Sequence, residues 1–283
     1  MSPPDIASTI IDKITPTGWT REYLINITSA LILTCAALAY RRWRIRRLYR
    51  GLFRLAKDRR FYIVCAGMEP EAFSLVSGAT TAQQQQNTVD LFYGTGYGEL
   101  ISMHNLTQVL SSIFGDLSKI VSAIDLGCRD QFVKRNLDND LLLIGGGTFN
   151  AVVRNVWSQI RHRVRFDIHD DLKSIPSGKF SIVDTHSNTT YEAEHDPESG
   201  EFVRDYGLIT RVHNPLNEES TVFIIDGLHS YGLIGASKLM LRKELEHFSR
   251  EIRKIGVKEF QILIECRIAQ PEVFIKKVFF HTL

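Results

Sequence analysis

The sequence predicts an α/β protein: a Rossmann-like mixed sheet with a C-terminal β-hairpin, preceded by one transmembrane helix. Three observations lead to this prediction. An uncharged apolar run near the N-terminus is followed by a block of arginines. Strand-like and helix-like segments alternate from residue 61 onward. The last two segments, 260–268 and 273–283, are strand-like runs joined by a turn that contains proline.

The apolar run from Tyr23 to Tyr40 holds 18 residues without a charge, which is near the lower limit for a helix that spans a bilayer. A signal peptide would carry its positive charge before the run, whereas here the charge follows it. A buried helix of a soluble domain would not usually be flanked by so basic a segment. We therefore expect a transmembrane helix over 23–40.

The charge around this run predicts its orientation. Residues 41–60 contain ten Lys/Arg and one acid, Asp58, and such a segment stays on the cytoplasmic side. We expect a single-pass protein of the inner or plasma membrane, with residues 1–22 outside and an α/β ligand-binding domain over 61–283 in the cytosol. The basic juxtamembrane segment either binds anionic membrane lipid or only sets the topology.

The overall charge argues against a nucleic-acid partner. The formal net charge is +2, and without residues 41–60 the rest of the chain is acidic, so no basic binding surface is predicted. The four cysteines lie far apart and form no CxxC pair, which favours a reducing compartment and predicts no metal site.

The alternation in the first half of the domain is clear. The pattern predicts strands over 61–67, 89–94 and 138–146, and helices over 101–114 and 147–160. The strand over 138–146 has four consecutive apolar residues, as expected for a strand covered on both faces.

The second half contains several short strands and one long helix. Residues 179–185 and 189–195 are expected to form a hairpin. The other expected elements are strands over 164–168, 205–215 and 221–227, and a helix over 231–256.

Three strand–turn–helix junctions are rich in glycine: 94–99, 145–150 and 227–232. Glycine lets the backbone approach a ligand, and the helix that follows offers unpaired N–H groups. Ligands of open α/β sheets bind at the carboxyl ends of strands, so the three turns predict one crevice for a phosphate-bearing or nucleotide-like ligand. No Lys-Ser/Thr follows the triple glycine, which excludes an ATP P-loop. The alternative is that the three are only tight turns.

The candidate side chains each have a second interpretation. Glu99 could be a general base or accept a ribose hydroxyl, or it could complement a helix dipole. Asp226 and His229 could perform acid–base chemistry, although no nucleophile lies near them in sequence. Catalytic roles for these three are weak predictions. Arg211 could pair with a phosphate or with Asp205.

Thr148 and Asn150 could contact a ligand or cap the following helix. The predicted ligand-binding residues are Gly94, Thr95, Gly96, Gly98, Glu99, Gly145, Gly146, Gly147, Thr148, Asn150, Arg211, Asn214, Gly227, His229, Ser230 and Gly232.

The run DLLLIGGGTFNAVVRNV resembles the strand–GGxxGT–helix element of SLOG-type Rossmannoid domains, the superfamily of LOG and DprA-like proteins. The order YGTGYGE, DLLLIGGGTFN, DYGLITRVHNP, VFIIDGLHSYGLIGA, FQILIE is similar to an uncharacterised prokaryotic family. That family is related to the C-terminal region of archaeal S-layer proteins. The resemblance implies a sensor of nucleotide-derived ligands in bacterial signalling and anti-phage defence. LOG enzymes have a catalytic Glu just after GGxGT, where this chain has Asn150, Ala151 and Val152.

Three functions are therefore considered. The first is a membrane-anchored sensor or effector that binds a nucleotide-like signal and self-associates into a homo-oligomer. The second is a membrane-tethered nucleotide or NAD hydrolase that uses Glu99, Asp226 or His229. The third is a non-catalytic scaffold whose glycine turns are structural. No definite cofactor is predicted, and a nucleotide-like ligand is the expectation.

Overall fold

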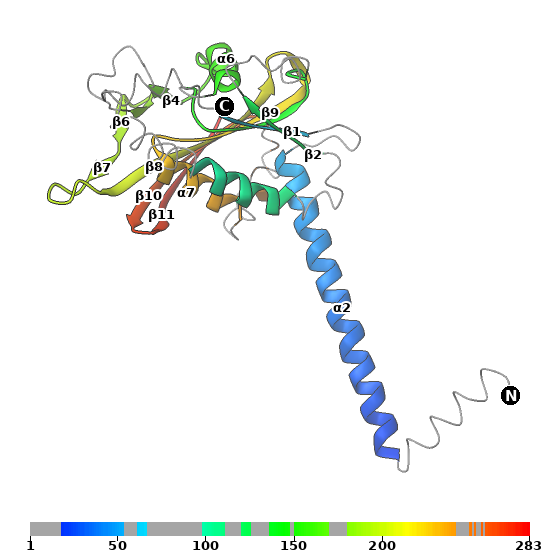
Figure 1. Cartoon of the computed structure of the whole chain (residues 1–283). Coiled ribbons are helices and arrows are strands. Elements are labelled where there is room, and N and C mark those ends of the chain that lie inside the picture. The colour runs from blue at the N-terminus through cyan, green and yellow to red at the C-terminus, as the bar shows by residue number, and fades with distance from the viewer. Residues whose placement is uncertain are drawn as a thin grey trace, which may run out of the picture. The chain divides into compact units, whose positions relative to one another are not determined.

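The structure is a computed structural model of the whole chain (Figure 1). It divides into two units, Met1–Arg47 and Leu48–Leu283. The described residues are 18–53, 61–66, 98–110, 120–125, 136–147, 150–169, 180–241, 249–250, 252, 256 and 258–283.

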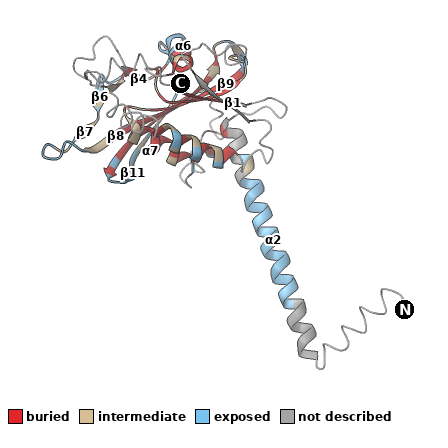
Figure 2. Cartoon of the chain, viewed as in Figure 1, coloured by how far each residue is buried: buried red, intermediate tan, exposed pale blue. Residues whose placement is uncertain are grey.

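The first element, α2 (Gly18–Phe53), is a helix of 36 residues that includes both the apolar run and much of the basic segment. Its side chains are exposed from residue 26 to residue 44, Arg46 is partly buried, and Leu52 is buried (Figure 2). Leu33 is 70% exposed. Among the residues described, no helix combines the length and the apolar character needed to cross a membrane.

The main sheet is mixed, as the sequence predicts. Four strands are parallel in the order β2-β1-β3-β9, and β8, β10 and β11 continue the sheet with antiparallel pairing. A short strand, β7, also pairs with β8. The strands are β1 (Phe61–Ala66), β2 (Ile120–Asp125), β3 (Asp140–Ile144), β7 (Glu194–His195), β8 (Phe202–Asn214), β9 (Asn217–Gly227), β10 (Phe260–Ala269) and β11 (Glu272–Thr282).

Several predicted elements can be compared with these strands. The C-terminal hairpin is β10 and β11, with a cis peptide bond between Gln270 and Pro271. The strand β2 was not predicted, although its sequence, IVSAID, is rich in apolar and β-branched residues. The strand predicted over 89–94 lies outside the described residues. The helix predicted from 231 is α7 (Ser230–Met240), and part of its predicted continuation also lies outside them.

A second sheet of three antiparallel strands packs beside β8 and β10. It consists of β4 (Phe166–His169), β5 (Ser181–Asp184) and β6 (Thr189–Glu192), and the predicted hairpin is β5 with β6. The buried Gln261 of β10 connects the two sheets through hydrogen bonds. Its Oε1 accepts from the N–H groups of Arg165 and Phe166, and its Nε2 donates to the Phe166 carbonyl. These bonds satisfy a buried amide that would otherwise be costly.

Helices cover both faces of the main sheet (Figure 1). On one face lies α6 (Ala151–Ile160), whose buried Val152, Val153, Val156 and Ile160 pack with side chains of β1, β3 and β9. The other face carries α7 and the helix over residues 98–110. These two helices contact each other, because the Ser102 hydroxyl donates to the Leu233 carbonyl at 3.2 Å.

The contact between α7 and β8 is close because glycines form it. A Cβ on Gly232 would overlap the carbonyl oxygen of Tyr206, and a Cβ on Gly207 would overlap the carbonyl oxygen of Gly232. Both obstacles are backbone atoms, which cannot turn aside as a flexible side chain can. The backbone of α7 therefore lies directly on β8, and this face of the sheet is tightly closed.

Arg211 of β8 holds the last turn of α2. Its side chain is buried, its Nη1 donates to the Leu52 carbonyl at 2.6 Å, and its Nε donates to the Lys258 carbonyl at 2.8 Å. The guanidinium also lies 4.6 Å from the centre of the Phe260 ring. Helix C-termini leave carbonyl groups without partners, and a cation is favourable there. Arg211 therefore has a structural role.

Candidate functional site

The carboxyl ends of β1, β3 and β9 lie side by side at one edge of the sheet. The chain runs from β1 outward to β2 and then returns to β3 on the other side of β1. The order of the strands therefore reverses direction between β1 and β3. In open α/β sheets such a reversal marks the place where ligands bind. Two of the predicted glycine turns, after β3 and β9, meet at this edge.

The turn after β3 is held by the backbone and by Asn150. The Gly145 N–H donates to the Ile225 carbonyl at 3.0 Å, and Gly145 has a φ of 90°, which favours glycine. The Oδ1 of Asn150 accepts from the N–H groups of Val152 and Val153, and its Nδ2 donates to the carbonyls of Val64 and Ile144. The capping interpretation of Asn150 is confirmed, and its amide joins β1, β3 and α6.

The turn after β9 differs from the prediction in one respect that matters for anions. The N-terminus of α7 is occupied by Asp205 of β8, whose Oδ2 accepts from the Gly232 N–H at 2.6 Å and whose Oδ1 accepts from the Tyr206 N–H. Asp205 is fully buried, and burial raises its pKa to about 7 despite these bonds. A protein carboxyl group therefore stands where a ligand phosphate was expected.

Glu99 and Asp226 come from opposite faces of the sheet and interact at this edge. Asp226 is buried, and its Oδ1 accepts from the Gly227 N–H at 2.7 Å. Burial, with a further contribution from Asp226, raises the pKa of Glu99 to about 8. Glu99 in turn contributes to the raised pKa of Cys65, after burial, which is the main cause. At neutral pH the Glu99 carboxyl group is mostly protonated and can donate a hydrogen bond.

His229 faces an aromatic cluster. Its ring centre lies 4.6 Å from that of Phe202 and 5.6 Å from that of Phe180. Burial, followed by the neighbouring His195, lowers the pKa of His229 to about 4. The imidazole is therefore neutral at pH 7, and its surroundings are aromatic. This arrangement does not support the predicted acid–base pair with Asp226.

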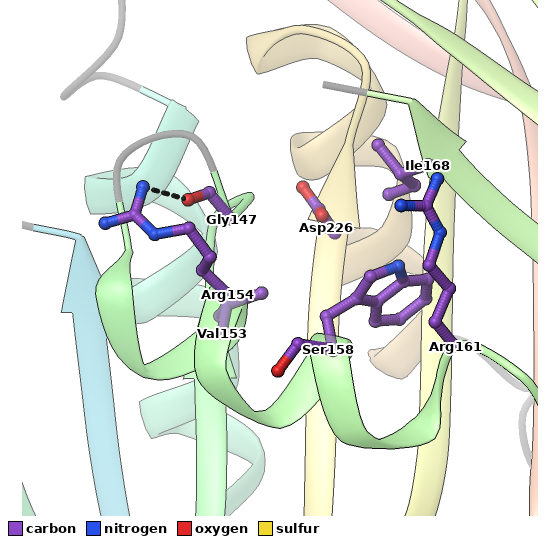
Figure 3. A pocket seen from close by; sticks show the side chains of 8 residues that line it. Gly147, Val153, Arg154, Ser158, Arg161, Ile168 and Asp226 are labelled. Carbon is purple, nitrogen blue, oxygen red and sulfur yellow. Dashed lines mark hydrogen bonds between the residues drawn. The ribbon is translucent and has the colours of Figure 1, made fainter. Parts of the chain in front are cut away.

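A small open hollow of about 140 Å³ lies on the α6 side of the same edge (Figure 3). Asp226 reaches it from the end of β9, and Trp157 also lines it. Its lining residues are Gly147, Val153, Arg154, Trp157, Ser158, Arg161, Ile168 and Asp226. Arg154 donates from Nη1 to the Gly147 carbonyl at 3.0 Å, and Arg161 donates from Nε to Asp167 at 2.6 Å.

The structure brings together part of the predicted ligand-binding set. The residues at or next to the edge are Gly98, Glu99, Gly145, Gly146, Gly147, Asn150, Gly227, His229, Ser230 and Gly232. The predicted contacts Gly94, Thr95, Gly96 and Thr148 lie outside the described residues.

Arg211 and Asn214 lie away from this edge. Because β8 is antiparallel to β9, Gly207 pairs with Gly227 whereas Asn214 pairs with Asn217 at the opposite end. Asn214 donates to the carbonyls of Leu137 and Asn139. Six residues of strand separate Arg211 from Asp205, about 20 Å, so the considered Asp205–Arg211 ion pair is wrong.

Sequence reasoning missed the residues of α6 that line the hollow. Arg154, Trp157, Ser158 and Arg161 recur at intervals of three and four, the spacing of one helix face. That spacing was available in the sequence. The same spacing is typical of the solvent-facing side of any amphipathic helix, so it does not by itself indicate a site.

Within the described part of the chain, no group of three His, Cys, Asp or Glu side chains is arranged to hold a metal ion. A scan against protein-family models and a search of curated proteins find no match for this chain.

Proposed function

We propose that this chain is a membrane-anchored sensor whose Rossmann-like domain binds a nucleotide-like ligand at the carboxyl edge of its parallel strands. The observation that carries the proposal is that two glycine turns and the buried Asp226 lie beside the reversal in strand order, where Asp226 also raises the pKa of Glu99. A protonated carboxyl group beside a second carboxyl group offers one donor and several acceptors, which suits the vicinal hydroxyls of a ribose.

The binding proposal is tested by ligand-dependent stability of the purified full-length protein. A nucleotide that binds the folded state raises the melting temperature in proportion to the logarithm of its concentration. We expect a shift with at least one member of a panel of mono-, di- and cyclic nucleotides, and a smaller shift in Glu99→Gln and Asp226→Asn. Glu192→Gln, at an exposed position on β6, is the matched control. A panel without any shift would contradict the proposal.

Membrane anchoring is supported by α2. Exposed apolar side chains, including Ile27, Ile32 and Leu33, point in different directions around the helix and so form no single apolar stripe. A helix that is apolar on all sides suits a lipid environment. The apolar run of the sequence extends to Tyr23, whose side chain lies outside the described residues. Eighteen residues of helix span about 27 Å, close to the hydrocarbon thickness of roughly 30 Å.

Anchoring is tested by alkaline extraction of membranes from cells that express the full chain. We expect the wild-type protein to stay with the membranes, and Leu33→Arg to be released, because a central arginine costs about 3 kcal/mol on insertion scales. Leu216→Arg is the matched control, since Leu216 is an exposed leucine in the β8–β9 turn. Release of the wild-type protein would contradict anchoring.

A hydrolase is the second candidate, and the raised pKa of Glu99 beside Asp226 favours it. A carboxyl group with a pKa near neutrality can donate a proton to a leaving group while a neighbouring carboxylate assists. Incubation of the protein with NAD and nucleotides, followed by chromatography of the products, distinguishes the two functions. Turnover that is lost in Glu99→Gln would establish the enzyme, whereas binding without turnover favours the sensor.

A further inference from the structure

The hollow beside α6 is built around one buried acceptor. Asp226 is 4% exposed, and its carboxyl group reaches the hollow from the end of β9 (Figure 3). Gly146 leaves room for it, since a Cβ at this position would lie 3.0 Å from Oδ1. A larger residue at 146 would therefore crowd this carboxyl group. The second glycine of the triple-glycine turn keeps this acceptor accessible.

The size of the hollow limits what it can hold. Its volume of about 140 Å³ is close to the roughly 150 Å³ of an engineered cavity that binds one benzene molecule. Pockets for whole drug-sized ligands occupy about 300–1,000 Å³. The hollow therefore suits a single ring of a larger molecule, with any substituents extending through its open side.

The walls indicate which kind of ring fits. The Trp157 Nε1 donates to Asp167 at 3.0 Å, and the indole also packs against two apolar clusters, so its orientation is fixed while it still lines the hollow. A sugar ring has an apolar C–H face that can lie on an indole and hydroxyls that can donate to a carboxylate. Asp226 and Trp157 together provide both surfaces.

The rim indicates what the ring carries. Arg154 lies on α6, and Arg161, seven positions further on, is the residue that follows its last turn. The spacing of two helical turns places both on the same side, and both line the hollow. A guanidinium has five N–H donors in a planar fork and recognises phosphate through two of them at once. Gly147 and Asp167 orient the two groups. The two guanidinium groups lie at opposite ends of the hollow, with Asp226 between them (Figure 3). An anionic substituent at the Gly147 end of the hollow would therefore meet Arg154.

We propose that this hollow binds a pentose phosphate, with Asp226 accepting from the sugar hydroxyls, Trp157 in contact with the ring, and Arg154 on the phosphate. The proposal rests on the proposed function, because it assigns the sugar-phosphate part of a nucleotide-like ligand to a particular surface. The same chemistry occurs in free ribose 5-phosphate and in a nucleotide.

The test is calorimetric titration of the full-length protein with ribose 5-phosphate, ribose and inorganic phosphate. We expect ribose 5-phosphate to bind at least tenfold more tightly than either fragment. Arg154→Gln should weaken ribose 5-phosphate at least tenfold, and Gly146→Ala should weaken both ribose 5-phosphate and ribose. Arg163→Gln is the matched control, because Arg163 is an exposed arginine beyond the end of α6 that approaches Glu259 instead.

Arg161→Gln removes one partner of Asp167, which also accepts from Trp157. The affinity of this variant is therefore compared only where its melting temperature matches that of the wild type. Arg154 is exposed and provides the primary test. The proposal is overturned by absence of ribose 5-phosphate binding, or by equal affinity in the wild type and Arg154→Gln. Nucleotide binding that depends on Glu99 but not on Arg154 would retain the proposed function and reject this site. Ribose 5-phosphate binding that depends on Arg154, without any nucleotide binding, would retain the site and reject the function.

Discussion

The pKa of Glu99 makes the stability of the folded protein depend on pH in a way that one substitution should reveal. Burial and Asp226 raise this pKa from its ordinary value of 4.5 to about 8. Between these two pH values the folded state retains a proton that the unfolded chain has released. The stabilisation is present in full below pH 4.5 and is lost as the pH rises to about 8. Where the folded state holds one proton more than the unfolded state, the free energy of unfolding falls by about 1.4 kcal/mol for each unit by which the pH rises.

Glu99→Gln removes this proton and keeps the shape of the side chain. From pH 5.5 to 7.5, we expect the free energy of unfolding to fall by about 2–3 kcal/mol less in the variant than in the wild type. Asp205 has a pKa raised to about 7 and His229 a pKa lowered to about 4, so both also contribute to the pH dependence. Their contributions are shared by the two proteins and cancel in the difference.

Urea unfolding of the full-length proteins, followed by tryptophan fluorescence at intervals of half a pH unit, measures this difference. Glu192→Gln should follow the wild-type curve, since that side chain is exposed on β6. Parallel curves for the wild type and Glu99→Gln would refute the reasoning, because they would mean that Glu99 has the same pKa in the folded and unfolded states.

Three further predictions concern stability. Gly232→Ala should lower the free energy of unfolding by more than the 1–3 kcal/mol typical of overpacking, because its Cβ meets backbone, whereas Gly235→Ala meets a cysteine sulfur and should cost less; chemical denaturation compares them. Arg211→Met should lower the free energy of unfolding by about 3–5 kcal/mol, because the carbonyls of Leu52 and Lys258 lose their donor. Amide hydrogen exchange should then increase in residues 48–53. The bond from Arg165 lowers the pKa of Asp184. As the pH falls below 4, Asp184→Asn should therefore lose less stability than the wild type, and acid titrations followed by circular dichroism test this.

The parts of the fold that follow from local pattern could be predicted. The strand β3 has four consecutive apolar residues and is buried throughout, and β9 follows the same rule along most of its length. Asn150 stands where capping residues stand, and it caps α6. These predictions succeed because burial on both faces and helix capping depend on residues that are neighbours in the chain.

The site could be predicted only in part, because it depends on the direction of β8. Arg211 and Asn214 follow Asp205 closely in sequence and were expected at the same place. The β8–β9 hairpin makes β8 run away from the carboxyl edge, so these side chains lie at the far end. The Asn-Pro at residues 214–215 predicts that a strand ends there, but it does not predict at which edge of the sheet that end lies. The direction of β8 depends on its pairing with other strands, and the same pairing brings Asp205 to the N-terminus of α7.

The two faces of the sheet differ in what they offer an anionic ligand, and this difference limits where a phosphate can lie. On the α7 face, backbone contact through glycine leaves no space, and the carboxyl group of Asp205 accepts the N–H of Gly232. A phosphate there would have to displace a buried carboxyl group and would gain no cation. On the α6 face, the hollow is open and Arg154 and Arg161 line it. A ligand that carries both hydroxyls and a phosphate should therefore place its phosphate over α6, with Asp226 between the phosphate and the closed face.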